Sequence, residues 1–95
     1  MRGHTWDRNR YEISILAKLW RRNLFGGKYE PLEKLMSDIP SERRDEARKA
    51  FDQLHSDGLI IFHKGKKCAS INTNYKEEVR EELEGEIPDY ILNLR

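Results

Sequence analysis

The stretch ARKAFDQLHSDGLIIFHKGKKCASIN, residues 47–72, decides the fold of this chain. Apolar side chains between Ala47 and Leu54 recur at the spacing of one helical face, and Gly58 follows where a helix can end in the left-handed conformation. Two runs rich in β-branched or apolar residues come next, and the lysine- and glycine-containing segment between them is typical of a hairpin loop. The stretch therefore predicts a helix that leads directly into a two-stranded hairpin.

The hairpin has a predicted register. A loop at residues 64–67 joins strands at 59–63 and 68–72, so that His63 pairs with Cys68 and the other cross-strand pairs follow. We expect the core to lie against the face that carries Ile60, Phe62, Ala69 and Ile71. The opposite face, which is not convincingly polar, carries Leu59, Ile61, His63, Cys68 and Ser70.

Residues before this stretch predict two further helices and a short strand. The first helix spans residues 7–22 with Asp7 as its N-cap. After Gly26-Gly27, residues 28–30 are expected to form an edge strand. Pro31 then suits the first turn of a second helix at 31–37, which ends before Pro40. The helix that contains Ala47 spans about residues 41–57. The buried face of the first helix is expected to hold Tyr11, Ile15, Leu16, Leu19 and Trp20.

Residues after the hairpin predict a fourth helix and an apolar tail. Asn74 is the expected N-cap of this helix, which ends at Gly85. The tail, residues 86–95, carries too many apolar side chains for a disordered end. We expect it to dock on Leu59 and Ile61 or on a second copy of the chain.

The composition fits one small domain with little excess charge. The 95 residues suffice for a single core, and 18 Lys and Arg against 17 Asp and Glu give a formal charge of +1. Nucleic-acid-binding domains are usually far more basic, so any DNA affinity must come from local clusters of charge. A single cysteine, Cys68, and the lack of a long apolar segment predict a reducing, cytoplasmic setting without a membrane anchor.

The order of elements resembles the winged-helix superfamily. Residues 54–60, LHSDGLI, look like the junction that those domains use between recognition helix and wing. A closer resemblance is to small, largely uncharacterised archaeal winged-helix proteins. That resemblance is carried by Gly26-Gly27-Lys28, Ile39-Pro40, Arg44, the Gly58 junction and Ser70-Ile71-Asn72.

The resemblance implies an α+β, mainly α fold: a winged helix-turn-helix with a three-helix core, a C-terminal β-hairpin wing and an additional C-terminal helix. The winged-helix domain would span residues 1–85, and the tail would span residues 86–95. In winged-helix proteins the exposed N-terminal half of the third helix faces the major groove of DNA. The matching positions in this sequence are Ser41, Arg43, Arg44, Arg48 and Lys49.

Acidic residues on the same helix weaken the prediction of DNA binding. Glu42, Asp45, Glu46 and Asp52 would repel phosphates and could pair with the arginines at three- or four-residue spacing. The alternative is therefore a solvated, salt-bridged surface helix. The loop at 64–67 is less ambiguous, because Lys64, Lys66 and Lys67 form a cationic cluster without acids. Lysines at a hairpin tip also serve solubility, so both readings of the loop stay open.

No motif indicates an enzyme or a cofactor. No His, Ser or Cys lies in a recognisable nucleophile or general-base motif, and no glycine-rich phosphate loop follows a strand. His63 and Cys68, with His55 or His4, could in principle bind zinc, but the paired ligand spacings of zinc sites are absent. We therefore predict no catalytic residues, no cofactor and no metal site.

Two functions remain as predictions. The first is a DNA-binding transcriptional regulator, a homodimer on double-stranded DNA, that uses the third helix and the lysine-rich wing. The second is a winged-helix protein-interaction module without direct DNA binding, which the near-neutral charge and the apolar tail favour.

Overall fold

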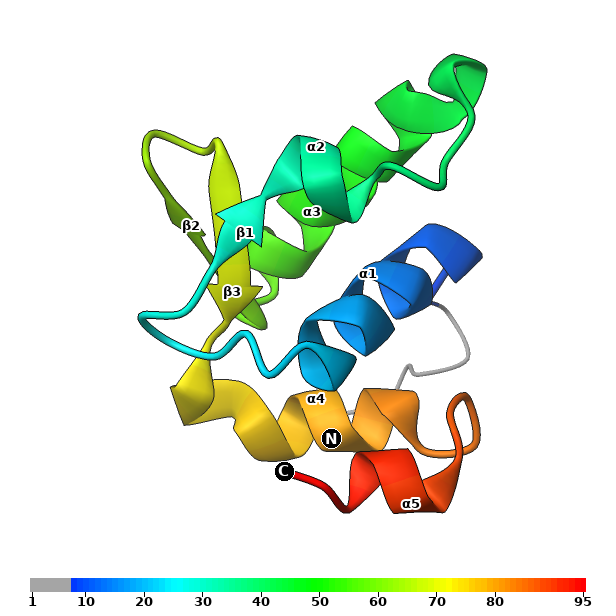
Figure 1. The fold of residues 1–95 in the computed structure, drawn as a ribbon, viewed down its shortest axis with the longest axis vertical. Coiled ribbons are helices and arrows are strands. Elements are labelled where there is room, and N and C mark those ends of the chain that lie inside the picture. Colours follow the sequence, from blue (N-terminus) through cyan, green and yellow to red (C-terminus); the bar gives the residue numbers. More distant parts are fainter. Residues whose placement is uncertain (1–7) are drawn as a thin grey trace.

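The fold is α+β and mainly helical, with a small antiparallel sheet (Figure 1). The structure is a computed structural model that describes residues 8–95. No helix in this part of the chain is long and apolar enough to cross a membrane. The elements are α1 (Arg10–Arg21), β1 (Glu30–Pro31), α2 (Leu32–Leu35), α3 (Arg44–Ser56), β2 (Ile60–His63), β3 (Cys68–Ile71), α4 (Lys76–Leu83) and α5 (Asp89–Leu92).

Helix α1 begins three residues later than the sequence predicted. Asn9 is its N-cap, because the Asn9 side chain accepts a hydrogen bond of 2.9 Å from the Glu12 amide. The prediction of Asp7 as the cap was therefore wrong, and Asp7 itself lies outside the described residues. The apolar face was predicted correctly, since Ile15, Leu16, Leu19 and Trp20 are all fully buried and Tyr11 is half-buried.

Helix α2 is shorter than expected at both ends, and at its start the reason is that Pro31 belongs to a strand. Pro31 pairs with Cys68 in β1 and then serves as the N-cap of α2, whereas the sequence had placed it in the first helical turn. Proline fits an edge strand because it has no N–H to leave unpaired. Helix α2 ends at Leu35, and a 3₁₀ turn, Ser41–Arg43, precedes α3.

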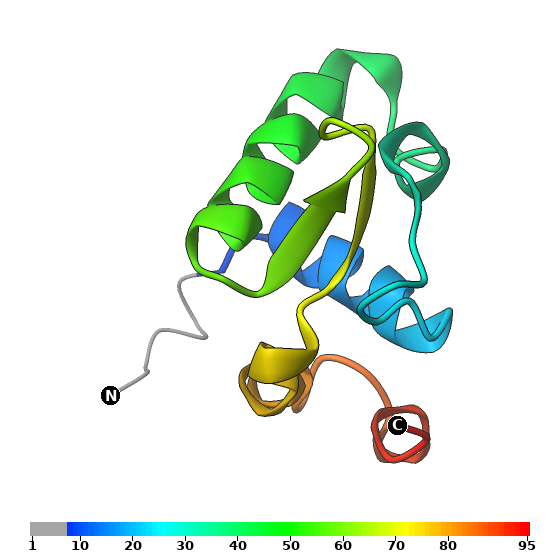
Figure 2. The same cartoon turned by 90° about the vertical axis from the view of Figure 1, so that its left-hand side faces the viewer.

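The sheet has the strand order β1-β3-β2, with the hairpin register that the sequence predicted. His63 pairs with Cys68 and Ile60 pairs with Ile71. Gly58 ends α3 with φ of +85°, as expected. Figure 2 shows the hairpin lying along α3. Ile60, Ala69 and Ile71 are buried, while Phe62 is half-buried against the core.

The opposite face of the hairpin is covered by the segment that leads to β1. The Ser70 hydroxyl is fully buried and donates a 2.8 Å hydrogen bond to the Gly26 carbonyl. The Tyr29 ring stacks on the His63 ring with centroids 4.2 Å apart. This cover explains why the sequence of that face is not clearly polar.

Helix α1 is the centre of the core and packs against α3, α4 and β3. Trp20 is fully buried and meets the Phe25 ring edge-on at 5.4 Å. Burial of one large apolar side chain contributes about 1.5–3 kcal/mol to folding. The Trp20 indole N–H donates to the Ile91 carbonyl at 3.3 Å, so the same residue also anchors the C-terminal segment.

The apolar tail docks on its own chain. Leu92 and Ile87 are buried, and Arg95 donates to the Trp20 carbonyl at 3.0 Å. The tail therefore lies against α1, and not on Leu59 and Ile61 as one prediction had it. Helix α4 also starts later than predicted: Tyr75, not Asn74, is at its N-cap and makes no side-chain cap hydrogen bond. Asn72 caps the preceding 3₁₀ turn, Thr73–Tyr75.

Arg8 ties three helices together. Its guanidinium lies 2.6 Å from the Asp57 carboxylate at the end of α3 and 3.2 Å from the buried Glu82 carboxylate on α4. Burial alone would lower the pKa of Arg8, but the hydrogen bond to Asp57 and the charge of Glu82 outweigh it and raise that pKa. This ion-pair cluster fixes the position of α1 under the C-terminal end of α3.

Candidate nucleic-acid interface

The five helix residues predicted to contact DNA fall on two adjacent elements. Ser41 and Arg43 belong to the 3₁₀ turn, and the other three belong to the first half of α3. The opposite side of α3 is buried through Ala47, Ala50, Phe51 and Leu54, as the sequence predicted. This packing fixes which side of the helix faces solvent. The exposed members of the set are Ser41, Arg43, Arg48 and Lys49.

Two of the arginines pair with acids on the same segment. Arg43 lies 3.2 Å from Glu46, and Arg48 lies 3.6 Å from Asp45. The hydrogen bond to Glu46 and the neighbouring Tyr11 raise the pKa of Arg43. All four of these charged side chains are more than half exposed, and such pairs are worth about 0–1 kcal/mol. A phosphate could therefore displace either acid at small cost.

Arg44 has a different role. Its Nε donates a 3.1 Å hydrogen bond to the Ile39 carbonyl, and the side chain is half-buried. The contact stabilises the turn between α2 and α3. In this structure the Arg44 guanidinium is therefore committed, in part, to the position of α3.

The three loop lysines lie on an unusual left-handed turn, and all are exposed. Lys64, Gly65 and Lys66 have φ values of +57°, +65° and +73°. A non-glycine residue in this region costs about 1–2 kcal/mol. The turn is held by the Lys67 amide, which donates to the His63 carbonyl at 3.1 Å, and by the Lys67 carbonyl, which accepts from Leu32 at 2.8 Å.

Lys66 connects the loop to α3. Its Nζ lies 3.2 Å from the Asp52 carboxylate and 5.3 Å from the centre of the Phe62 ring. The loop and the exposed side of α3 are therefore parts of one surface. Among residues 8–95, no acid pairs with Lys64, Lys67 or Lys49. Together with Arg44, which bonds a carbonyl, these three are the cations of the predicted site that have no acid partner among residues 8–95.

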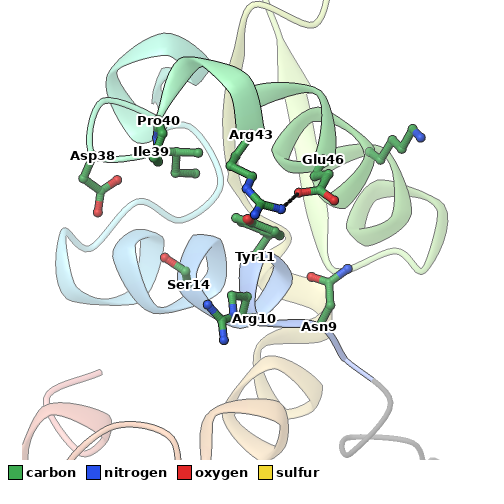
Figure 3. Close-up of a pocket in the computed structure, with 10 residues that line it drawn as sticks. Asn9, Arg10, Tyr11, Ser14, Asp38, Ile39, Pro40, Arg43 and Glu46 are labelled. Carbon is green, nitrogen blue, oxygen red and sulfur yellow. Dashed lines mark hydrogen bonds and ion pairs between the residues drawn. The ribbon is translucent and has the colours of Figure 1, made fainter.

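A broad cleft of about 1080 Å³ borders α3 along the edge that carries Glu46 and Lys49 (Figure 3). Arg43 extends over the Tyr11 ring toward Glu46 in the middle of this cleft. The sequence did not indicate the cleft, because it joins the start of α1 to the turn before α3. Its lining comprises Asn9, Arg10, Tyr11, Ser14, Asp38, Ile39, Pro40, Arg43, Glu46 and Lys49.

Acids in the cleft are already neutralised within the protein. Asp38 pairs with Lys18, and Glu46 pairs with Arg43. The hydrogen bond from Lys18 lowers the pKa of Asp38. Arg10 and Lys49 then give this border of α3 an excess of positive charge. The surface around α3 thus has cations on both of its long edges.

The His63 and Ser70 pair has a structural role. Their side chains are 3.0 Å apart. Because Ser70 gives its only hydroxyl hydrogen to Gly26, His63 Nε2 must donate to the Ser70 oxygen. Ser70 is also fully buried, so its hydroxyl has no access to a substrate. Within the described part of the chain, no three His, Cys, Asp or Glu side chains are grouped to hold a metal ion.

Comparisons of the chain with protein-family models, with curated proteins and with solved structures find no match. The resemblance to winged-helix proteins stays a prediction.

Proposed function

We propose that this protein is a winged helix-turn-helix that binds double-stranded DNA and acts as a transcriptional regulator. Helix α3 would enter the major groove, and the wing, residues 60–71, would lie on the adjacent backbone. One observation carries the proposal. The contact between Lys66 and Asp52 places the lysine-rich loop beside the exposed side of α3, so both can meet one duplex.

The charges favour contact with phosphates over contact with bases. Lys49, Lys64 and Lys67 have no acid partner among residues 8–95, whereas Arg43 and Arg48 are paired. Arg48 is the best candidate for a base edge, because its pair with Asp45 is exposed and therefore weak. Neutralisation of a few phosphates gives weak, strongly salt-dependent binding. We expect affinity from the lysines and modest sequence preference from Arg48.

The proposal is tested by titration of a labelled mixed-sequence duplex at low salt. Lys64→Glu and Lys67→Glu should each weaken binding by about tenfold, because each replaces an attraction to phosphate with a repulsion. Lys76→Glu makes the same change of charge at the start of α4, outside the proposed surface, and should have a much smaller effect. Equal effects of all three substitutions would indicate nonspecific attraction and contradict the proposed surface.

A protein-interaction module is the alternative function. It is favoured by the acids of α3, which pair with Arg43, Arg48 and Lys66 and leave little net charge on that helix. If it is correct, the parent protein will not bind duplex DNA even at low salt.

A further inference from the structure

A second, smaller groove of about 510 Å³ runs beside α1. Its lining residues come from α1, the turn before α3 and the turn that leads into α5. Ile13, Ala17 and Ile87 contribute apolar surface to its lining. Arg10 and Arg21 also line it, and both are exposed.

The charge of this groove is positive. No acid among the described residues pairs with Arg10 or Arg21, and Asp38 in the lining is held by Lys18. Glu86 is the other acid in the lining. An occupant with apolar side chains and an acid beside them would complement such a groove.

The C-terminal segment of the same chain carries side chains with these properties. Tyr90 and Leu94 are 73% and 61% exposed, and they are two of the three large apolar side chains that are exposed among residues 8–95. Tyr90 lies on α5, and Leu94 lies in the turn that directly follows this helix, where its amide donates to the Ile91 carbonyl at 3.1 Å. Asp89 precedes Tyr90 and is exposed, as is Glu84.

We propose that the protein forms a twofold dimer in which Tyr90 and Leu94 of each copy occupy the α1 groove of the other. Ile87 lines the groove and lies three residues before Tyr90. The groove and the Tyr90–Leu94 pair are therefore neighbours on the molecule. A twofold axis beside the groove brings the Tyr90–Leu94 pair of each copy to the groove of the other copy. The acids of one copy, Asp89 and Glu84, then approach Arg10 and Arg21 of the other. The contact is small, so the dimer should form in the micromolar range.

Sedimentation of the full chain over the micromolar range tests the dimer. The parent should pass from monomer to dimer, and Tyr90→Ser should weaken association by about tenfold or more. Tyr75→Ser, which removes an exposed tyrosine before α4, should leave association unchanged. A parent that stays monomeric throughout, or a Tyr90→Ser variant that associates like the parent, would overturn the proposal.

A charge exchange tests the pairing itself. One variant carries Arg10→Glu with Arg21→Glu, and the other carries Glu84→Lys with Asp89→Lys. Each variant alone places like charges in both contacts and should be monomeric. An equimolar mixture restores opposite charges in both contacts, so it should sediment as a heterodimer. All four positions are exposed, so both variants should fold. A mixture that stays monomeric would contradict the pairing.

Discussion

Lys66 Nζ lies 3.2 Å from the Asp52 carboxylate, and this contact joins the tip of the hairpin to α3. Both side chains are more than half exposed, so the ion pair adds little to stability. Its consequence is electrostatic, because Asp52 neutralises one of the three lysines that the proposed function assigns to DNA.

Removal of the Asp52 carboxylate should strengthen DNA binding. Asp52→Asn frees Lys66 and deletes a negative charge next to the proposed phosphate path. We expect a several-fold higher affinity at low salt, with the gain disappearing at high salt. The free energy of unfolding should change by less than about 0.5 kcal/mol. Glu77→Gln on α4 has the same change in charge and serves as the control. Equal gains for both variants would argue against a local effect.

Gly58 should resist substitution at the junction of α3 and β2. Its φ is +85°, and an added Cβ would lie 3.1 Å from the Tyr75 ring. Strain and steric conflict together predict that Gly58→Ala destabilises the protein by about 1–3 kcal/mol in urea unfolding. Gly27→Ala is the matched control, because its φ is not positive and its Cβ would contact nothing within 4 Å. That control should be neutral or slightly stabilising.

Ser70 should matter for stability through its hydroxyl. Ser70→Ala leaves the Gly26 carbonyl and His63 Nε2 without their hydrogen-bond partner. Loss of a buried partner costs about 1–3 kcal/mol, measurable by urea unfolding. Ser56→Ala, at the exposed end of α3, should stay within about 0.5 kcal/mol of the parent. A Ser70→Ala variant as stable as the parent would contradict this role of the hydroxyl.

Asp38 should make a small pH-dependent contribution to stability. Its pKa is lowered in the folded protein by the hydrogen bond from Lys18. The contribution is therefore full above the unfolded pKa, about pH 4, and is lost as the pH falls through the folded value. The Asp38 side chain is 65% exposed, so we expect less than about 1 kcal/mol. Asp38→Asn should be less stable than the parent near neutral pH and equal to it in strong acid. A difference in the free energy of unfolding between the two proteins that does not change with pH would rule out this linkage.

The sequence predicted the hairpin and the buried faces well, because both follow from local periodicity. The register of His63 against Cys68 needed only the loop length and the alternation of side chains. Helix ends were predicted less well. Asp7 and Asn9 both precede the same apolar run, and only the geometry shows that Asn9 accepts the Glu12 amide. Pro31 suits either a helix start or an edge strand, and pairing with Cys68 decides between them.

The sequence predicted which side of the third helix is exposed, but it predicted only in part which charges of the candidate site are paired. Spacing in the sequence already indicated pairs such as Arg43 with Glu46. The contact of Lys66 with Asp52 depends on how the hairpin packs on α3, so no local pattern in the sequence predicts it. The bond from Arg44 to Ile39 depends likewise on the direction of a carbonyl in the turn.

The salt dependence of duplex binding tests the central claim most directly. The structure leaves Lys49, Lys64 and Lys67 without acid partners among residues 8–95, and each phosphate contact contributes about −0.9 to the slope of log K against log salt. The proposed DNA-binding surface predicts a slope of about −3 for the parent and of about −1 for Lys64→Gln combined with Lys67→Gln. A slope that is the same in both proteins, or a parent that does not bind duplex DNA at low salt, would contradict it.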